Sequence, residues 1–133
     1  MKTQKIVWMG RILSALVVLP FAFSAAAKLF PEALYPKMHQ EMVAIGLPES
    51  ILPTVATLEI LCIVTYLIPA TSVLGAVLFT GYLGGAMLTH LRAGEPVVMH
   101  IVLGTVIWLG LYLREPRLHA LLPFRRKACQ SPQ

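Results

Sequence analysis

Residues 51–68 read ILPTVATLEILCIVTYLI, an apolar stretch with a single charged side chain, Glu59, near its middle. The length is near the lower limit that an α-helix needs to cross a hydrocarbon core of about 30 Å. Glu59 would then lie about 12 Å from the start of the helix, at a rise of 1.5 Å per residue. A charge at that depth costs free energy, so Glu59 requires either a partner or a function.

Three further apolar runs of similar length cover residues 12–29, 73–90 and 97–113. Charged residues make up only 13% of the chain, about half the usual share in a soluble domain. Four such runs in 133 residues leave no material for a soluble domain. We therefore predict an all-α membrane protein, a single integral membrane domain over residues 1–133 built as an antiparallel bundle of four transmembrane helices.

The first run permits a second interpretation. A basic start, an apolar run and the small residues 24–27 also resemble a cleavable signal peptide. Cleavage would leave three spans. We retain the segment as the first span.

The basic residues are distributed unevenly between the two ends of the predicted bundle. Only Lys28, Lys37 and Arg92 fall in the first and third connections, and the other eight of the eleven precede the first span or follow the last. By the positive-inside rule, both termini lie in the cytoplasm. The net charge of +5 then reflects topology and contact with anionic lipid, and we predict no nucleic-acid partner. The eight residues are Lys2, Lys5, Arg11, Arg114, Arg117, Arg125, Arg126 and Lys127.

The first connection, residues 30–50, contains a helical pattern of its own. Met38, Met42 and Ile45 recur at helical spacing, Gly46 provides a stop, and Pro48 follows. We predict a short amphipathic helix in this outer loop, lying on the surface or capping the bundle.

The polar residues of the spans fall into one half of the predicted bundle. Low dielectric requires a buried carboxylate to be paired, so we expect Glu59 to pair with Lys28, Arg92 or His90. Two interpretations remain open: an ion pair that pins the bundle, or an outward-facing pocket for a small molecule, a quinone head group or a proton. The residues of this layer are Lys28, Glu59, Tyr82, His90, Arg92 and His100.

Several kinds of site are disfavoured by the sequence. A metal held by Glu59, His90 and His100 would need convergent geometry that the spacing does not indicate, so we predict no metal site. Cys62 and Cys129 form no Cys-x-x-Cys motif, which argues against a membrane thiol oxidoreductase. Dinucleotide-binding and haem-attachment motifs are also absent from the sequence, so we predict no intrinsic cofactor. Any redox chemistry would use a partner or a diffusible quinone.

Gly81 and Gly85 form a Gly-x-x-x-Gly pair in the third run. Such a pair creates a helix face that another helix can approach closely. The approach could come from within the bundle or from a second copy of the chain in a homodimer.

Several segments resemble the DoxX-like family, a branch of the wider DoxX/DoxD group of small bacterial four-helix membrane proteins. They are residues 26–30 (AAKLF), 46–48 (GLP), 57–59 (TLE), 66–69 (YLIP), 81–86 (GYLGGA), 89–92 (THLR) and 108–114 (WLGLYLR). The resemblance implies a multi-pass bundle in the bacterial inner membrane. Related groups include the small subunit of a thiosulfate:quinone oxidoreductase and partners of membrane redox complexes. The resemblance therefore implies a redox-associated subunit with a protein partner, without carrying over a catalytic residue.

Three functions follow as hypotheses. The first is a membrane subunit, itself non-catalytic, that binds a small ligand or a partner through the polar layer. The second is a proton-coupled exporter, since small multidrug transporters share the length, the four spans and a membrane glutamate. Their essential carboxylate lies in the first span, however, and this chain has none there. The third is a structural or assembly factor without a ligand.

Overall fold

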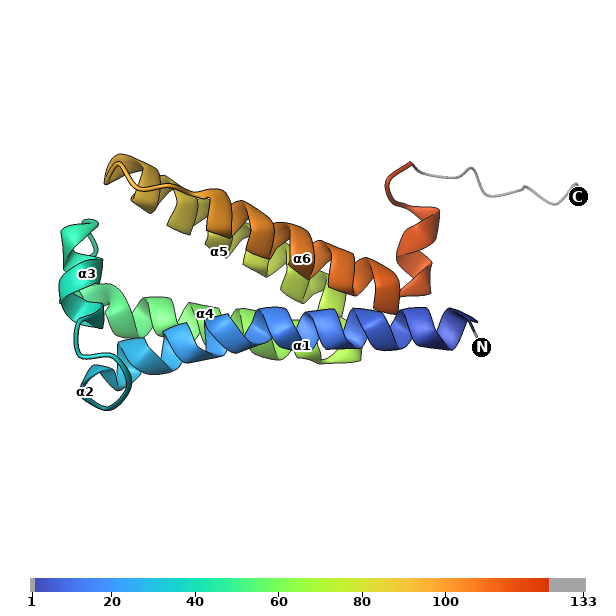
Figure 1. Ribbon diagram of the computed structural model, residues 1–133, viewed down its shortest axis with the longest axis horizontal. Coiled ribbons are helices and arrows are strands. Elements are labelled where there is room, and N and C mark those ends of the chain that lie inside the picture. The colour runs from blue at the N-terminus through green and yellow to red at the C-terminus, as the bar shows by residue number, and fades with distance from the viewer. Residues whose placement is uncertain (1, 125–133) are drawn as a thin grey trace, which may run out of the picture.

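The computed structural model describes residues 2–124 of the chain. The predictions on the basic residues Arg125, Arg126 and Lys127 and on Cys129 concern positions outside the described residues. Every secondary-structure element of the described part is a helix, and four of these helices are long (Figure 1). These are α1 (Lys2–Leu29), α4 (Leu52–Leu67), α5 (Ser72–Arg92) and α6 (Val98–Arg114). The shorter elements are α2 (Pro31–Leu34), α3 (Met38–Ala44) and the single turns η1 (Glu49–Ile51), η2 (Pro69–Thr71) and η3 (Pro116–Ala120).

The four long helices coincide with the four predicted spans. By length and composition, three stretches of the described residues can cross a membrane: Lys2–Leu29, Glu49–Leu67 and Pro69–Arg92. The fourth, α6, has 17 residues and is about 25 Å long at 1.5 Å per residue. The largest difference lies in α1, which begins ten residues before the apolar run and continues through Pro20. The all-α membrane architecture predicted from the apolar runs is confirmed.

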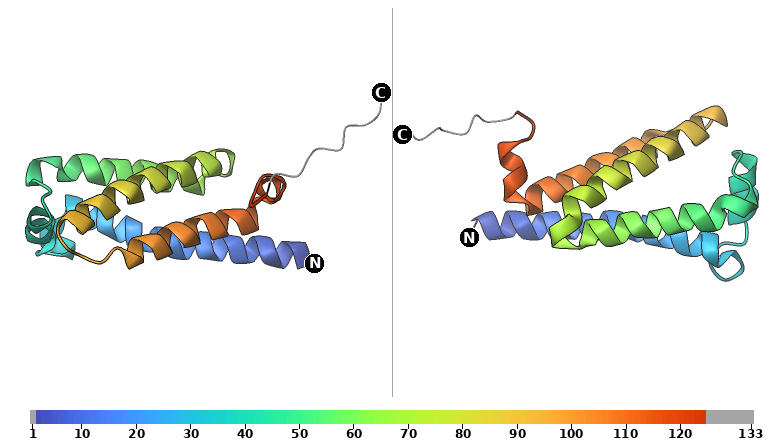
Figure 2. Two further views of the ribbon diagram at one scale, coloured as in Figure 1. Left: turned by 90° about the horizontal axis from the view of Figure 1, so that it is seen from above. Right: turned by 180° about the vertical axis from the view of Figure 1, so that it is seen from behind.

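The four helices form a ring in which each helix contacts the next along the chain and α6 returns to α1. Packed pairs are α1 with α4, α4 with α5, α5 with α6, and α6 with α1. Neighbours run in opposite directions (Figures 1 and 2). One end of the bundle, here called the terminal end, holds the start of α1, η2 and the end of α6. The opposite end, the loop end, holds α2, α3 and the connection between α5 and α6.

Glycines allow the helices to approach one another closely at the terminal end. A Cβ placed on Gly75 would lie 2.3 Å from the backbone nitrogen of Tyr66, so α5 packs directly against the backbone of α4. A Cβ on Gly10 would lie 2.8 Å from the carbonyl oxygen of Gly110, where α1 crosses α6. Only glycine permits these contacts without displacing a helix.

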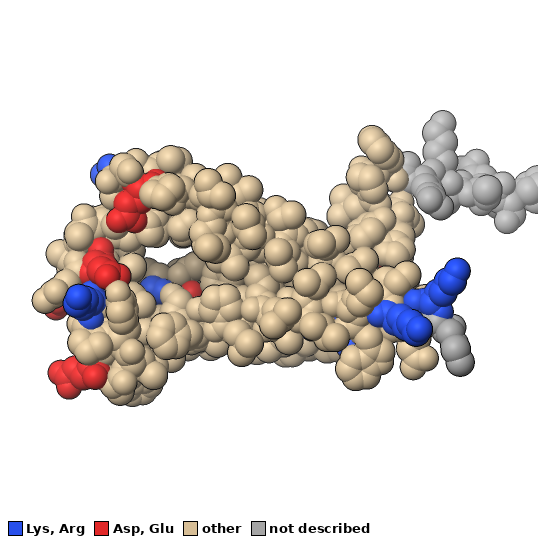
Figure 3. All heavy atoms as spheres, in the orientation of Figure 1, with Lys and Arg blue, Asp and Glu red and all other residues tan. Residues whose placement is uncertain are grey.

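The helices separate toward the loop end. The α5–α6 pair diverges from α1 and α4 there (Figures 1 and 2). The space-filling view is hollowed between the two layers at the same end (Figure 3). The predicted amphipathic helix is α3, which buries Met38 and is followed by the buried Ile45. It caps α1 and α4, and this part of the prediction is confirmed; the short α2, which begins at Pro31, was not predicted.

Candidate functional site

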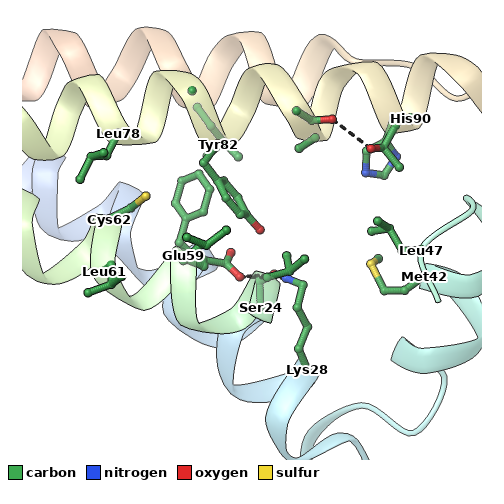
Figure 4. Close-up of a pocket in the computed structure, with 18 of the residues that line it drawn as sticks. Ser24, Lys28, Met42, Leu47, Glu59, Leu61, Cys62, Leu78, Tyr82 and His90 are labelled. Atoms are coloured by element: carbon green, nitrogen blue, oxygen red, sulfur yellow. Dashed lines mark hydrogen bonds and ion pairs between the residues drawn. The ribbon is translucent and has the colours of Figure 1, made fainter. Parts of the chain in front are cut away.

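A cavity of about 690 Å³ lies between α1, α4 and α5 at the loop end. Its volume falls within the range of about 300–1,000 Å³ that is usual for small-molecule sites. Met42, Ile45 and Leu47, from α3 and the segment after it, close part of its loop end. Most of the wall is apolar, and Ser24, Lys28, Glu59 and Tyr82 gather in one corner (Figure 4).

The polar corner is built around an ion pair between α1 and α4. Lys28 Nζ lies 2.8 Å from Glu59 Oε2. Both residues are nearly inaccessible, with exposed fractions of 6% for Lys28 and 1% for Glu59. A charge-assisted hydrogen bond at this distance is what makes two charges tolerable at such burial. Of the three partners that the sequence left open for Glu59, the structure selects Lys28.

Ser24 completes the hydrogen bonding of this pair. It precedes Lys28 by one helical turn on α1, so both side chains lie on the same face. Lys28 Nζ donates to Ser24 Oγ, and Ser24 Oγ donates to Glu59 Oε2 at 3.4 Å. One ring nitrogen of His39, on α3, lies 3.3 Å from the backbone oxygen of Lys28. This contact joins α3 to the end of α1 beside the ion pair.

Tyr82 reaches the same corner from α5. Its hydroxyl group points toward the carboxylate of Glu59 (Figure 4). The ring of Tyr82 packs edge-on against Phe21 with centroids 6.3 Å apart, and Phe21 also contacts Phe79 at 4.7 Å. These aromatic contacts hold the phenol in place. The corner therefore presents an ammonium, a carboxylate and a hydroxyl group to one point of the cavity.

His90 lies at the loop-end mouth of the cavity rather than in its polar corner (Figure 4). Its Nδ1 is 2.6 Å from Glu95 Oε2. Its ring lies 4.6 Å from the ring of His100 on α6. His100 does not line the cavity, and its buried Nδ1 has no hydrogen-bond partner among the described residues.

The predicted layer of six polar residues is thus divided. Lys28, Glu59 and Tyr82 come together, and His90 and His100 form a separate pair near the mouth. Arg92 is exposed and does not line the cavity. The reason is helical geometry: Arg92 follows His90 by two positions, which places it on the opposite face of α5. Treating all six as one layer from depth alone was wrong for Arg92.

Gly81 and Gly85 do not form a packing face with any other helix of residues 2–124. A Cβ on either glycine would meet nothing within 4 Å among the described residues. Both line the cavity. The predicted close approach of a helix of the same bundle at these two positions is therefore wrong, and the homodimer contact stays a prediction. Their lack of side chains instead leaves open space beside Tyr82.

A comparison with known protein families matches residues 12–112 to the DoxX-like family. The chain belongs to the DoxX-like family. The matched region includes all of α4 and α5, most of α1 and α6, and every residue of the polar corner. With its long apolar helices, this DoxX-like protein is a multi-pass membrane protein in contact with the lipid bilayer. Searches of curated proteins and of solved structures give no match to it.

Some residues of the site in this DoxX-like protein escaped the sequence analysis. Ser24 was grouped with its small neighbours, although its spacing of one turn from Lys28 was a usable signal. Cys62, considered in the sequence only for a Cys-x-x-Cys motif, is buried and lines the cavity together with Glu59. No group of three His, Cys, Asp or Glu side chains within residues 2–124 is arranged to hold a metal ion.

The arrangement suits a molecule with an apolar body and one polar head. Lys28 and Tyr82 can donate hydrogen bonds to such a head, and Glu59 can accept one. Because the surroundings are apolar, each of these hydrogen bonds is stronger than it would be in water. The ammonium and the carboxylate neutralise each other, so a head group without net charge fits best.

Proposed function

We propose that this DoxX-like protein binds a small lipid-soluble ligand of the quinone type in the cavity and acts as a non-catalytic membrane subunit in redox metabolism. The observation that supports this proposal is the buried Lys28–Glu59 pair at one corner of an otherwise apolar cavity. Groups related to the DoxX-like family include membrane subunits of redox complexes, and this relationship points to the same class of ligand.

The chain's own side chains fit a quinone head in three ways. Lys28 and Tyr82 would donate hydrogen bonds to a carbonyl oxygen. Glu59 would accept a hydrogen bond from a hydroxyl group in the reduced form. Gly81 and Gly85 leave space for a flat ring beside Tyr82. When bound, a quinone would supply the two-electron chemistry that none of these side chains provides.

The distribution of basic residues supports an orientation for the site. With both termini in the cytoplasm of a bacterium, the loop end faces the outside of the inner membrane. The cavity then lies in the outer half of the bilayer. This orientation would make the bound head group accessible to a partner on the outer side.

The transport alternative has less support. An exporter needs a route that opens alternately to both sides of the membrane. The terminal end is closed by Tyr66, Phe79 and Leu111, which are completely buried. The described residues thus form one conformation, hollow at the loop end and closed at the terminal end, and a binding site requires no more than this.

Binding of decyl-ubiquinone to the purified protein tests the proposal, together with mass spectrometry of co-purified lipid-soluble molecules. Gly85→Leu should fill the cavity and weaken binding by about tenfold or more, or ~1.4 kcal/mol. Gly84→Leu is the matched control, because Gly84 has equally open surroundings but does not line the cavity. Glu59→Gln should also weaken binding. Wild-type protein that neither carries nor binds a quinone, or equal binding by the two leucine variants, would contradict the proposal.

A further inference from the structure

The cavity reaches the lipid-facing surface of the bundle between α4 and α5. Leu58 and Leu61 on α4 and Val77 and Leu78 on α5 line the cavity. The same side chains are largely exposed, with exposed fractions of 52% for Leu61 and 40% for Leu78. On helices that cross a membrane, exposed apolar side chains of this kind contact lipid. These four residues therefore form the rim of a slot that connects the cavity with the bilayer.

The course of α4 and α5 creates this slot. The helices are in backbone contact at Gly75 and Tyr66, near the tight connection η2. They separate steadily toward the loop end (Figures 1 and 2). Gly81 and Gly85 lie where the helices are separated, and a Cβ on either would meet nothing within 4 Å among the described residues. Larger residues at these positions would narrow the slot.

The route from the aqueous phase is less open to a polar solute. Met42, Ile45 and Leu47 place an apolar edge at the loop end of the cavity. The contact of His39 with the backbone oxygen of Lys28 holds α3 over the end of α1. A solute entering there would pass between this edge and His90. An apolar molecule already dissolved in the bilayer meets only apolar side chains at the slot.

We propose that the ligand enters the cavity sideways from the leaflet at the loop end, through the slot between α4 and α5, and that it carries an apolar tail which remains in the slot. This inference rests on the proposed function of the cavity as a ligand site. The head would reach the polar corner at Lys28 and Glu59. The tail would lie between Leu58 and Leu61 on one side and Val77 and Leu78 on the other. The ligand class is an amphiphile with a compact neutral head and a single narrow tail.

Photolabelling from the bilayer tests the slot without a ligand. The full chain is reconstituted into phosphatidylcholine vesicles and irradiated with the lipid-soluble reagent 3-(trifluoromethyl)-3-phenyldiazirine, and labelled residues are mapped by mass spectrometry. We expect insertion at Phe21 and Cys62, which are almost inaccessible on the outer surface but line the cavity. Tyr66 and Phe79 are completely buried outside the cavity and should define the background.

A bulky side chain in the rim should block the slot. Leu78→Trp should reduce labelling of Cys62 to this background. Leu74→Trp is the matched control, one turn away on α5, exposed and outside the cavity lining, and should leave labelling unchanged. If Leu78→Trp does not fold, Leu61→Trp with Ile60→Trp as its control makes the same comparison on α4.

Two results would overturn the inference: background labelling of Phe21 and Cys62 in the wild type, or undiminished labelling of Cys62 in the folded rim variants. Competition with decyl-ubiquinone separates the inference from the proposed function. Protection of Cys62 would support both. Labelling through the slot that decyl-ubiquinone does not reduce would support the lateral opening and count against the quinone as ligand.

Discussion

Arg114 donates a hydrogen bond from Nη2 to the backbone oxygen of Tyr66 at 2.6 Å, and its guanidinium carbon lies 4.5 Å from the centre of the Tyr66 ring. The hydroxyl group of Tyr66 donates to the backbone oxygen of Ile107 at 2.7 Å and lies 3.1 Å from Ser14 Oγ. One completely buried side chain thus joins α1, α4 and α6 at the terminal end. This network fixes the end from which α4 and α5 diverge.

Tyr66→Phe should destabilise the protein by ~1–3 kcal/mol, because the backbone oxygen of Ile107 and the hydroxyl group of Ser14 lose their buried partner. Thermal unfolding in detergent micelles measures the loss. Tyr112→Phe is the control, since Tyr112 is only half-buried and its hydroxyl group has no hydrogen-bond partner among the described residues. Equal unfolding temperatures for the two variants would contradict the stabilising role assigned to the hydroxyl group of Tyr66.

Gly75→Ala should destabilise the bundle more than an alanine at any glycine of the cavity wall. The new Cβ would lie 2.3 Å from a backbone nitrogen of α4, which cannot move aside as a flexible side chain would. Overpacking of this kind typically costs ~1–3 kcal/mol.

Gly84→Ala provides the comparison on the same helix. Its Cβ would meet nothing within 4 Å among the described residues, and alanine favours the helix by up to about 1 kcal/mol over glycine. Unfolding of both variants in detergent would show the difference. A Gly75→Ala protein as stable as Gly84→Ala would mean that α4 and α5 are not in backbone contact.

The four helices could be predicted because the length of each apolar run can be counted directly in the sequence. The divergence of α5 from α4 could not be predicted. A helix face that contacts lipid and a helix face that contacts another helix carry the same kinds of apolar side chain. Gly81 and Gly85 illustrate this limit. Their spacing indicates a face without side chains, and that face serves equally for a packed helix and for a cavity wall. Only the positions of the neighbouring helices distinguish the two.

The candidate site was partly predictable for a similar reason. The ion pair of Glu59 followed from the cost of an isolated charge, which restricts the partner to a few cations. The positions of Lys28 and Tyr82 along their helices correctly indicated that they lie near Glu59. Position along a helix does not, however, specify the direction in which a side chain points around the helix axis. Arg92 was therefore included although it lies on the other face of α5. Arg114 was assigned to the membrane surface, whereas its long side chain reaches back to Tyr66.

Thr80→Val tests the packing of α6 on α5. The indole Nε1 of Trp108 donates to Thr80 Oγ1 at 2.9 Å. Hydrogen bonds between membrane helices contribute about 0.6 kcal/mol on average, so the loss of stability should be small. The fluorescence of Trp108, recorded in a Trp8→Phe background, should shift to shorter wavelength when the indole loses its partner.

Thr105→Val is the matched control for this experiment. Thr105 lies on α6, and its hydroxyl group donates only to the backbone of its own helix, at Ile101, within the described residues. Its replacement should leave the emission of Trp108 unchanged. An identical spectrum for Thr80→Val and the wild type would show that the indole is not bonded across the two helices.

A double-mutant cycle on Lys28 and Glu59 separates the two roles that this pair can have. Lys28→Met alone leaves a buried carboxylate, and Glu59→Leu alone leaves a buried ammonium. Removing one partner of a buried ion pair typically costs ~3–5 kcal/mol. Replacing both by apolar residues of similar size is often neutral or stabilising by about 1–4 kcal/mol. We therefore expect each single variant to be strongly destabilised and the double variant to recover much of the loss.

Ligand binding by the double variant then decides between a structural lock and a ligand site. If the pair serves the cavity, the double variant should fold well and fail to bind decyl-ubiquinone, because the polar corner is gone while the apolar wall remains. If the pair serves the bundle, the double variant should recover from the unpaired charge of the single variants but remain less stable than the wild type. Unfolding and binding must be measured on the same preparations, with Gly84→Leu as the reference that leaves both the ion pair and the cavity intact. A stable double variant that still binds decyl-ubiquinone at wild-type affinity would contradict both roles.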